Sequence, residues 1–156
     1  MHSEEILTWA REELIRLIKI PSVSGQEQQI LDYLEKRAGE LDLPVCHSSV
    51  SSSRWNLLIG NYNAPRLIFV VHVDTVKPVW EVATDIQVQG NCVWGLGAVD
   101  DKGGIVACLL ALMLARKAGV PLEELPVAPR FRFSGEVSDR YMTYTIVRIT
   151  ASGGAG

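Results

Sequence analysis

The feature that most limits how this chain can fold is the stretch LIFVVHVDTV at residues 67–76. Leu67 to Val71 form a continuous apolar run whose length is typical of a buried strand. His72 and Asp74 follow the run two residues apart, so in an extended strand both side chains would point to the same face. In an α/β sheet, ligand sites lie beyond strand ends, which makes this pair a candidate site. A simpler interpretation is that the two polar residues cap the next loop.

Two amphipathic helices are predicted before this strand. Apolar residues recur with helical spacing over residues 3–20, and Pro21 ends the pattern. In the next segment, Ser24 is followed three residues later by Glu27, which has the form of a capping box. The second helix is therefore expected to begin just after Ser24 and to end near residues 39–43.

The rest of the chain combines predicted strands with one further helix. A short strand start and then a polar loop are expected over residues 44–55. Further strands are expected at 56–60, 66–74, 86–88, 126–133 and 141–150. A strongly apolar helix is expected at 102–117 and should be buried on most sides, with Gly119 and Pro121 as terminators. This order predicts a mixed α/β layer architecture.

The composition is that of a globular domain and disfavours several functions. Of 156 residues, 47% are hydrophobic and 21% charged. The net charge is −3 and no basic patch is present, so neither nucleic acid nor a membrane is an expected partner. The N-terminus does not resemble a signal peptide, and the run from Ile105 to Ala115 is too short to span a bilayer. Cys46, Cys92 and Cys108 form no CxxC pair, which favours a reducing, cytoplasmic location.

A second motif, WGLGAVDDKGG at residues 94–104, places two carboxylates at the start of the apolar helix. Asp100 and Asp101 precede Lys102 and a glycine pair, and glycines let the backbone approach its neighbours closely. A carboxylate at this position could bridge two cations, or it could simply cap the helix. A nucleotide-binding loop is a third interpretation, but GLG does not continue as GxGxxG and no Walker pattern is present.

As a pair, HVDTV and the downstream GLGAVDDKGG resemble the zinc-dependent family of aminoacylases, acetylornithine deacetylases, succinyl-diaminopimelate desuccinylases and carboxypeptidases of the G type. The preceding order of a helix, IPSVSGQE, a second helix and NLLIG is similar to the opening of that family. The resemblance extends over residues 3–119. It implies an α/β fold, namely part of a three-layer zinc-exopeptidase-like catalytic domain with a mixed sheet flanked by helices, without the family's inserted dimerisation domain.

The resemblance also implies roles for individual residues. His72 matches the first metal ligand, Asp100 the carboxylate that bridges two zinc ions, and Asp74 the catalytic-site acid that orients His72. Asp101 follows Asp100, in this family often across a cis peptide bond. The implied cofactor is Zn²⁺, two ions per site, with Co²⁺ as a substitute. The implied activity is hydrolysis of amide bonds in N-acyl amino acids or small peptides, in which the metals activate a water and a glutamate moves its proton.

The sequence departs from the family pattern in its last part. The family's next motif is a pair of adjacent acids, whereas FRFSGEVSD has Glu136 alone and Asp139 three residues later, and no His follows His72. We therefore expect residues 1–125 to be the N-terminal part of a metallohydrolase catalytic domain and residues 126–156 a divergent tail, strand-like and then flexible. The alternative is a catalytically inactive fragment with weak metal binding or a fold completed by a partner, and self-association is expected of such a chain.

Overall fold

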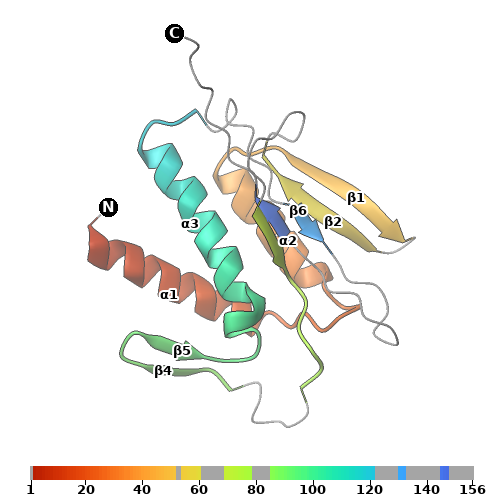
Figure 1. Ribbon diagram of the computed structural model, residues 1–156, viewed down its shortest axis with the longest axis horizontal. Helices are drawn as coiled ribbons and strands as arrows, with labels where there is room; N and C mark the ends of the chain where they lie inside the picture. The colour runs from red at the N-terminus through yellow and green to blue at the C-terminus, as the bar shows by residue number, and fades with distance from the viewer. Residues whose placement is uncertain are drawn as a thin grey trace.

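A computed structural model of the protein describes residues 2–51, 54–60, 69–78, 85–121, 130–132 and 145–147. Two helices come first along the chain, strands follow, and a third helix precedes the last two strands (Figure 1). The elements are α1 (Ser3–Lys19), α2 (Gln28–Glu40), β1 (Val45–Ser51), β2 (Arg54–Ile59), β3 (Phe69–His72), β4 (Gln87–Gln89), β5 (Cys92–Trp94), the short helical turn η2 (Ala98–Lys102), α3 (Gly103–Lys117), β6 (Arg130–Arg132) and β7 (Thr145–Val147).

The described strands form one mixed sheet and a separate hairpin. The sheet has the order β1-β2-β6-β3-β7, and β4 pairs only with β5. β3 runs parallel to β6, with His72 opposite Arg132, whereas β1 and β2 are antiparallel. A parallel pair inside a sheet needs a long crossover, and α3 lies in the segment between β3 and β6. The predicted α/β class is confirmed.

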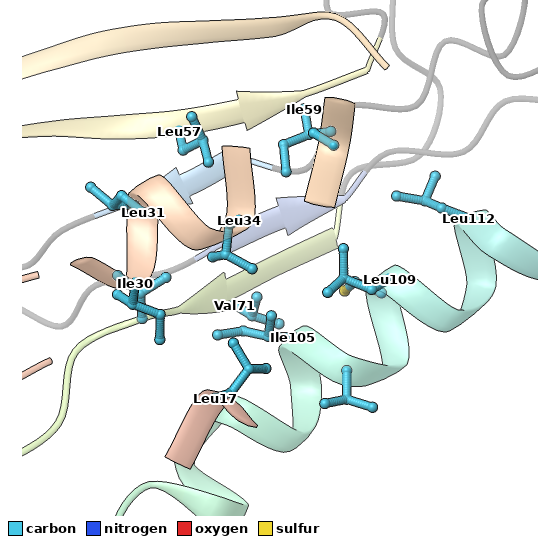
Figure 2. Close-up of a cluster of buried hydrophobic side chains, with 14 of the residues drawn as sticks. Leu17, Ile30, Leu31, Leu34, Leu57, Ile59, Val71, Ile105, Leu109 and Leu112 are labelled. Atoms are coloured by element: carbon cyan, nitrogen blue, oxygen red, sulfur yellow. The ribbon is translucent and has the colours of Figure 1, made fainter. Parts of the chain in front are cut away.

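The core lies between the helices and the sheet. Side chains from α1, α2 and α3 converge on β2 and β3 in Figure 2, and the labelled residues are Leu17, Ile30, Leu31, Leu34, Leu57, Ile59, Val71, Ile105, Leu109 and Leu112. In α3 only Ala107, Arg116 and Lys117 are exposed, which confirms a helix buried on most sides. In the described part of the chain, no helix has both the length and the apolar character needed to cross a membrane.

Helix α2 begins differently from the prediction. Its N-cap is Glu27, and no side chain caps the helix. The Glu27 carboxylate instead accepts a hydrogen bond of 2.7 Å from the backbone N–H of Gly25, and the Ser24 hydroxyl donates to Asp74. The capping box is therefore wrong, because both side chains have partners that lie outside the reciprocal pattern. The Ser24 hydroxyl is used for a tertiary contact fifty residues away.

The strand boundaries also differ in instructive ways. β1 continues through the serines that were expected to form a loop, with Ser48 opposite Asn56 and Ser49 opposite Trp55. Backbone pairing with β2 outweighs the polar composition, and polar side chains suit a strand at the sheet edge. The hairpin strand β5 was not predicted. The segments predicted as strands at 126–133 and 141–150 contain β6 and β7, and the rest of them, with residues 148–156, lies outside the described residues.

A buried carboxylate joins the first two helices. Glu13 of α1 is fully buried, and its Oε1 accepts hydrogen bonds from Tyr33 Oη at 2.7 Å and Arg37 Nε at 2.9 Å, both on α2. Its Oε2 accepts from Arg16 Nη1 at 3.1 Å. Burial, together with the bond to Glu13, raises the pKa of Tyr33 to about 12. Every oxygen of this carboxylate therefore has a donor, as burial of a charge requires.

Replacing Glu13 by Ala should lower the free energy of unfolding by about 2–3 kcal/mol, because it leaves buried donors of α2 without their acceptor. The matched control is Glu12→Ala, since Glu12 also pairs with Arg16 at 3.1 Å but is exposed. That change should cost less than about 1 kcal/mol. Urea unfolding followed by circular dichroism measures both, and equal losses would contradict the structural role of the buried carboxylate.

Candidate functional site

The candidate site begins where β3 ends. His72 is the last residue of β3, its side chain is largely buried, and the chain then turns through Asp74 and Thr75, both buried. Thr75 forms an isolated parallel bridge with Val23, in the segment between α1 and α2. The strand end is therefore held by a second stretch of backbone, which fixes the direction of the loop that contains Asp74.

Asp74 holds one side of the His72 ring. His72 Nδ1 lies 3.0 Å from the backbone oxygen of Asp74 and 3.4 Å from its Oδ1. The other carboxylate oxygen, Oδ2, accepts a hydrogen bond of 2.6 Å from the Ser24 hydroxyl. Acceptors at Nδ1 keep the proton on that nitrogen and leave Nε2 to face outward, which is the arrangement found in histidines that bind metals.

Asp100 and Asp101 meet His72 from the turn before α3. Gly97 has a φ of 76° and precedes this turn, which contains a cis peptide bond between Asp100 and Asp101. Asp100 Oδ1 lies 2.6 Å from His72 Nε2, and Asp101 Oδ2 accepts a hydrogen bond of 3.3 Å from the His72 backbone N–H. The structure thus brings together the three residues predicted from the sequence, His72, Asp74 and Asp100. It also contains the cis bond that the family resemblance implied.

The electrostatics of the site follow from these contacts. The bonds from Asp74, then Asp100, raise the pKa of His72 to about 9, against the opposing effect of burial. Burial raises the pKa of Asp101 above its ordinary value, and the His72 backbone N–H opposes that shift. The side chain of Asp100 is 78% exposed, so it faces solvent on the open side of the site. The contacts with Asp74 on one side and Asp100 on the other favour the protonated form of the ring.

Lys102 is a residue of this region to which the sequence analysis gave no role. It is only 2% exposed, and its Nζ donates hydrogen bonds of 2.9 Å to the backbone oxygens of Leu17 and Ile20. These carbonyls lie at the C-terminal end of α1, where a cation is favoured by the helix dipole. Burial alone lowers the pKa of Lys102 to about 8. The sequence offered one signal for this buried position, namely a lysine directly before a glycine pair and an apolar helix.

The other candidate donors that the structure describes, His47 and Cys108, do not join this group. Glu136 and Asp139 lie outside the described residues. His47 is exposed on β1, where it pairs with Glu35 at 3.2 Å. Cys108 is buried in α3, and burial raises the pKa of its thiol to about 12, which disfavours the thiolate that metals bind. Within the described ranges, no group of three or more His, Cys, Asp or Glu side chains is arranged to hold a metal ion.

Comparison with known proteins gives no matching family model but several relatives. A LysW-lysine/LysW-ornithine hydrolase of Sulfurisphaera tokodaii is 27% identical over 113 residues, which is 72% of this chain and 30% of the relative. A protein of Aeropyrum pernix, provisionally named as the same hydrolase, is 33% identical over 104 residues, which is 67% of this chain and 28% of the relative. A succinyl-diaminopimelate desuccinylase of Corynebacterium glutamicum is 36% identical over 98 residues, 60% of this chain and 25% of the relative.

The fold is similar to that of a solved peptidase. A solved tripeptidase from Staphylococcus aureus matches 82% of this chain and 36% of its own, with a TM-score of 0.61 at 21% identity. The chain belongs to the peptidase and deacylase family that includes these hydrolases and desuccinylases. The family resemblance predicted from the two motifs is confirmed, and so is a partial α/β peptidase fold. The matches cover only 25% to 30% of the length of these curated relatives.

The glycine pair of the family motif has a visible steric purpose. A Cβ on Gly104 would overlap Asp101 Oδ1 and would lie 2.9 Å from Val71 Cγ1. Gly104 therefore lets the first turn of α3 pass against both β3 and the Asp101 carboxylate. The close approach keeps the turn that presents Asp100 in place against the strand that presents His72.

Replacing Gly104 by Ala should lower the free energy of unfolding by about 1–3 kcal/mol, because the added methyl group overpacks this contact. Gly39→Ala, in the last turn of α2, is the matched control, since nothing lies within 4 Å of a Cβ there. Helix propensity alone should make that variant more stable by up to about 1 kcal/mol. Thermal unfolding of both variants measures the difference, and a neutral Gly104→Ala would rule out the steric role.

Proposed function

We propose that the chain forms part of the metal site of an amide-bond hydrolase, with His72 and Asp100 as metal ligands and Asp74 as the acid that orients His72. The observation that supports this proposal best is the separation of 2.6 Å between His72 Nε2 and Asp100 Oδ1. Once the Nε2 proton is released, an imidazole nitrogen beside a carboxylate oxygen at a strand end forms a donor pair that suits Zn²⁺, with Co²⁺ as a substitute.

The donor chemistry fits a metal, although the described residues supply only part of a full ligand set. Catalytic zinc sites use three protein ligands and a water. His72 and Asp100 provide two, and the described part of the chain holds no group of three. Further ligands would have to come from residues that the structure does not describe or from another chain. Binding by the two described ligands alone is expected to be weak.

The residues around the pair each have a defined task in such a site. Asp74 keeps the Nδ1 proton in place, so that the Nε2 lone pair is directed to the ion. Asp101 accepts the backbone N–H of His72 and holds the strand end against the turn. When bound, the metal would acidify a water and polarise the carbonyl of the scissile amide. Lys102 fixes the turn from the opposite side through the end of α1.

The proposed substrates are N-acyl amino acids or small peptides. The related proteins have names that describe removal of lysine or ornithine from LysW, cleavage of succinyl-diaminopimelate, or cleavage of tripeptides. These reactions share hydrolysis of an amide bond to an amino acid. The common chemistry supports the bond type for this chain, and the choice among these acyl or peptidyl groups is left to the assay.

A second candidate is a catalytically inactive fragment with weak metal binding, or a fold that a partner completes. The two-ligand donor set among the described residues favours it. Exposed apolar side chains also favour a chain that associates, including Val99 at 91% exposure, directly beside Asp100, and Val76 at 73%. Turnover separates this candidate from the first, because both predict that His72 binds metal.

Metal binding is the first test. Isothermal titration of the tag-free chain with Zn²⁺ should show one saturable event that His72→Ala abolishes and that Asp100→Asn weakens by at least about tenfold. His47→Ala is the matched control, because His47 also pairs with a carboxylate but is exposed on β1. Binding that survives in His72→Ala, or that is lost equally in His47→Ala, would overturn the assignment of the ligands.

Turnover is the second test. The chain loaded with Zn²⁺ or Co²⁺ is assayed for release of free amino acid from acetylated and succinylated amino acids and from dipeptides and tripeptides. Hydrolysis that disappears in His72→Ala and on addition of a chelator is the result expected of the hydrolase. Retained metal binding without turnover on any of these substrates would favour the inactive or partner-completed chain instead.

A further inference from the structure

We propose that Ser24 is a positioning residue of this metal site: its hydroxyl fixes the Asp74 carboxylate, which in turn fixes the ring of His72. The inference rests on the proposed function, because it treats His72 as a metal ligand. It assigns a task in the site to the segment between α1 and α2, from which no ligand is drawn. Ser24 acts only through Asp74 and touches neither substrate nor metal.

The contact itself has the geometry of a strong hydrogen bond. Ser24 Oγ lies 2.6 Å from Asp74 Oδ2, a length typical of a hydroxyl that donates to an ionised carboxylate. Asp74 is 7% exposed, so water cannot readily replace the donor. With Oδ2 held by Ser24, Oδ1 is directed toward His72 Nδ1 at 3.4 Å. The hydroxyl thereby sets the rotation of the carboxylate that the imidazole meets.

The backbone around Ser24 holds the hydroxyl in position. The Ser24 N–H donates to the Thr75 oxygen at 3.2 Å, and the Thr75 N–H donates to the Ser22 oxygen at 2.8 Å. One residue further on, the Gly25 N–H donates to the buried carboxylate of Glu27, which also accepts a bond of 2.6 Å from Arg54 Nη2 of β2. The loop is fixed from both sides, so little side-chain freedom is lost when Ser24 binds Asp74.

A purely structural role is the competing explanation. Ser24 does not cap α2, because the N-cap of that helix is Glu27 and no side-chain bond is made there. The loop also has its own backbone bonds, which the loss of one hydroxyl leaves intact. The two explanations differ in what they predict for the metal: a structural residue changes stability, whereas a positioning residue changes the affinity and the ligand geometry at constant fold.

The experiment compares Ser24→Ala, Ser24→Thr and Ser22→Ala with the unaltered full chain. Ser22→Ala is the matched control, because the Ser22 hydroxyl is buried in the same segment and has no hydrogen-bond partner among the described residues. Dissociation constants for Zn²⁺ are measured by competition with a chromophoric chelator. The visible absorption of bound Co²⁺ reports the ligand geometry, and thermal unfolding in chelator reports the fold.

Ser24→Ala should weaken Zn²⁺ binding by about 10–100-fold, because loss of the groups that orient a metal-bound His has an effect of that size. It should also alter the Co²⁺ spectrum. Ser24→Thr retains a hydroxyl and should restore most of the affinity, and Ser22→Ala should bind as the unaltered chain does. Unchanged affinity and spectrum in Ser24→Ala, with the unaltered chain binding normally, would overturn the role of Ser24 alone. Absence of binding in the unaltered chain would overturn the proposed function together with this inference.

Discussion

The hydrogen bond between His72 and Asp100 joins the end of β3 to the turn that precedes α3, and it depends on the same packing of α3 against β3 that builds the core. For the two side chains to touch, α3 must start directly against the strand, which requires the missing side chain of Gly104. The apolar face of α3 then covers β3, so the helix that completes the core directly follows the turn that presents Asp100. The packing of α3 against β3 therefore determines both the core and the geometry of the site.

The main helices and the strand that ends at His72 were predictable, because the sequence signals for them are local. The apolar run ending at His72 predicted a strand with a polar end, and the apolar stretch after the glycine pair predicted a buried helix. Helix α1 ends before Pro21 as expected. The juxtaposition of His72 with Asp100 could not be obtained from periodicity, because it depends on how two elements pack. It came from the resemblance of the two motifs to one family.

The errors and omissions have one physical cause. Ser24 and Glu27 fit the local rule for a capping box, but their side chains bind Asp74, Gly25 and Arg54. Lys102 had no predicted role and is buried against the end of α1. The serines of β1 were predicted to form a loop after a short strand start, and they form a strand because β2 pairs with them. In each case a tertiary partner outweighs the local preference, and single-sequence patterns do not contain that partner.

Apart from the contact of His72 with Asp74, the contacts that assemble the site join residues that are distant along the chain. The separation is 50 residues for Ser24 with Asp74, 28 for His72 with Asp100, and 85 for Lys102 with Leu17. During synthesis the first helix must therefore wait until Lys102 has emerged before its terminal carbonyls find their cation. Non-local contacts of this kind slow folding, because the chain must close a long loop before it gains the contact. During synthesis the complete site can therefore form only after the chain has been made as far as Lys102, which is later than the strand that contains its histidine.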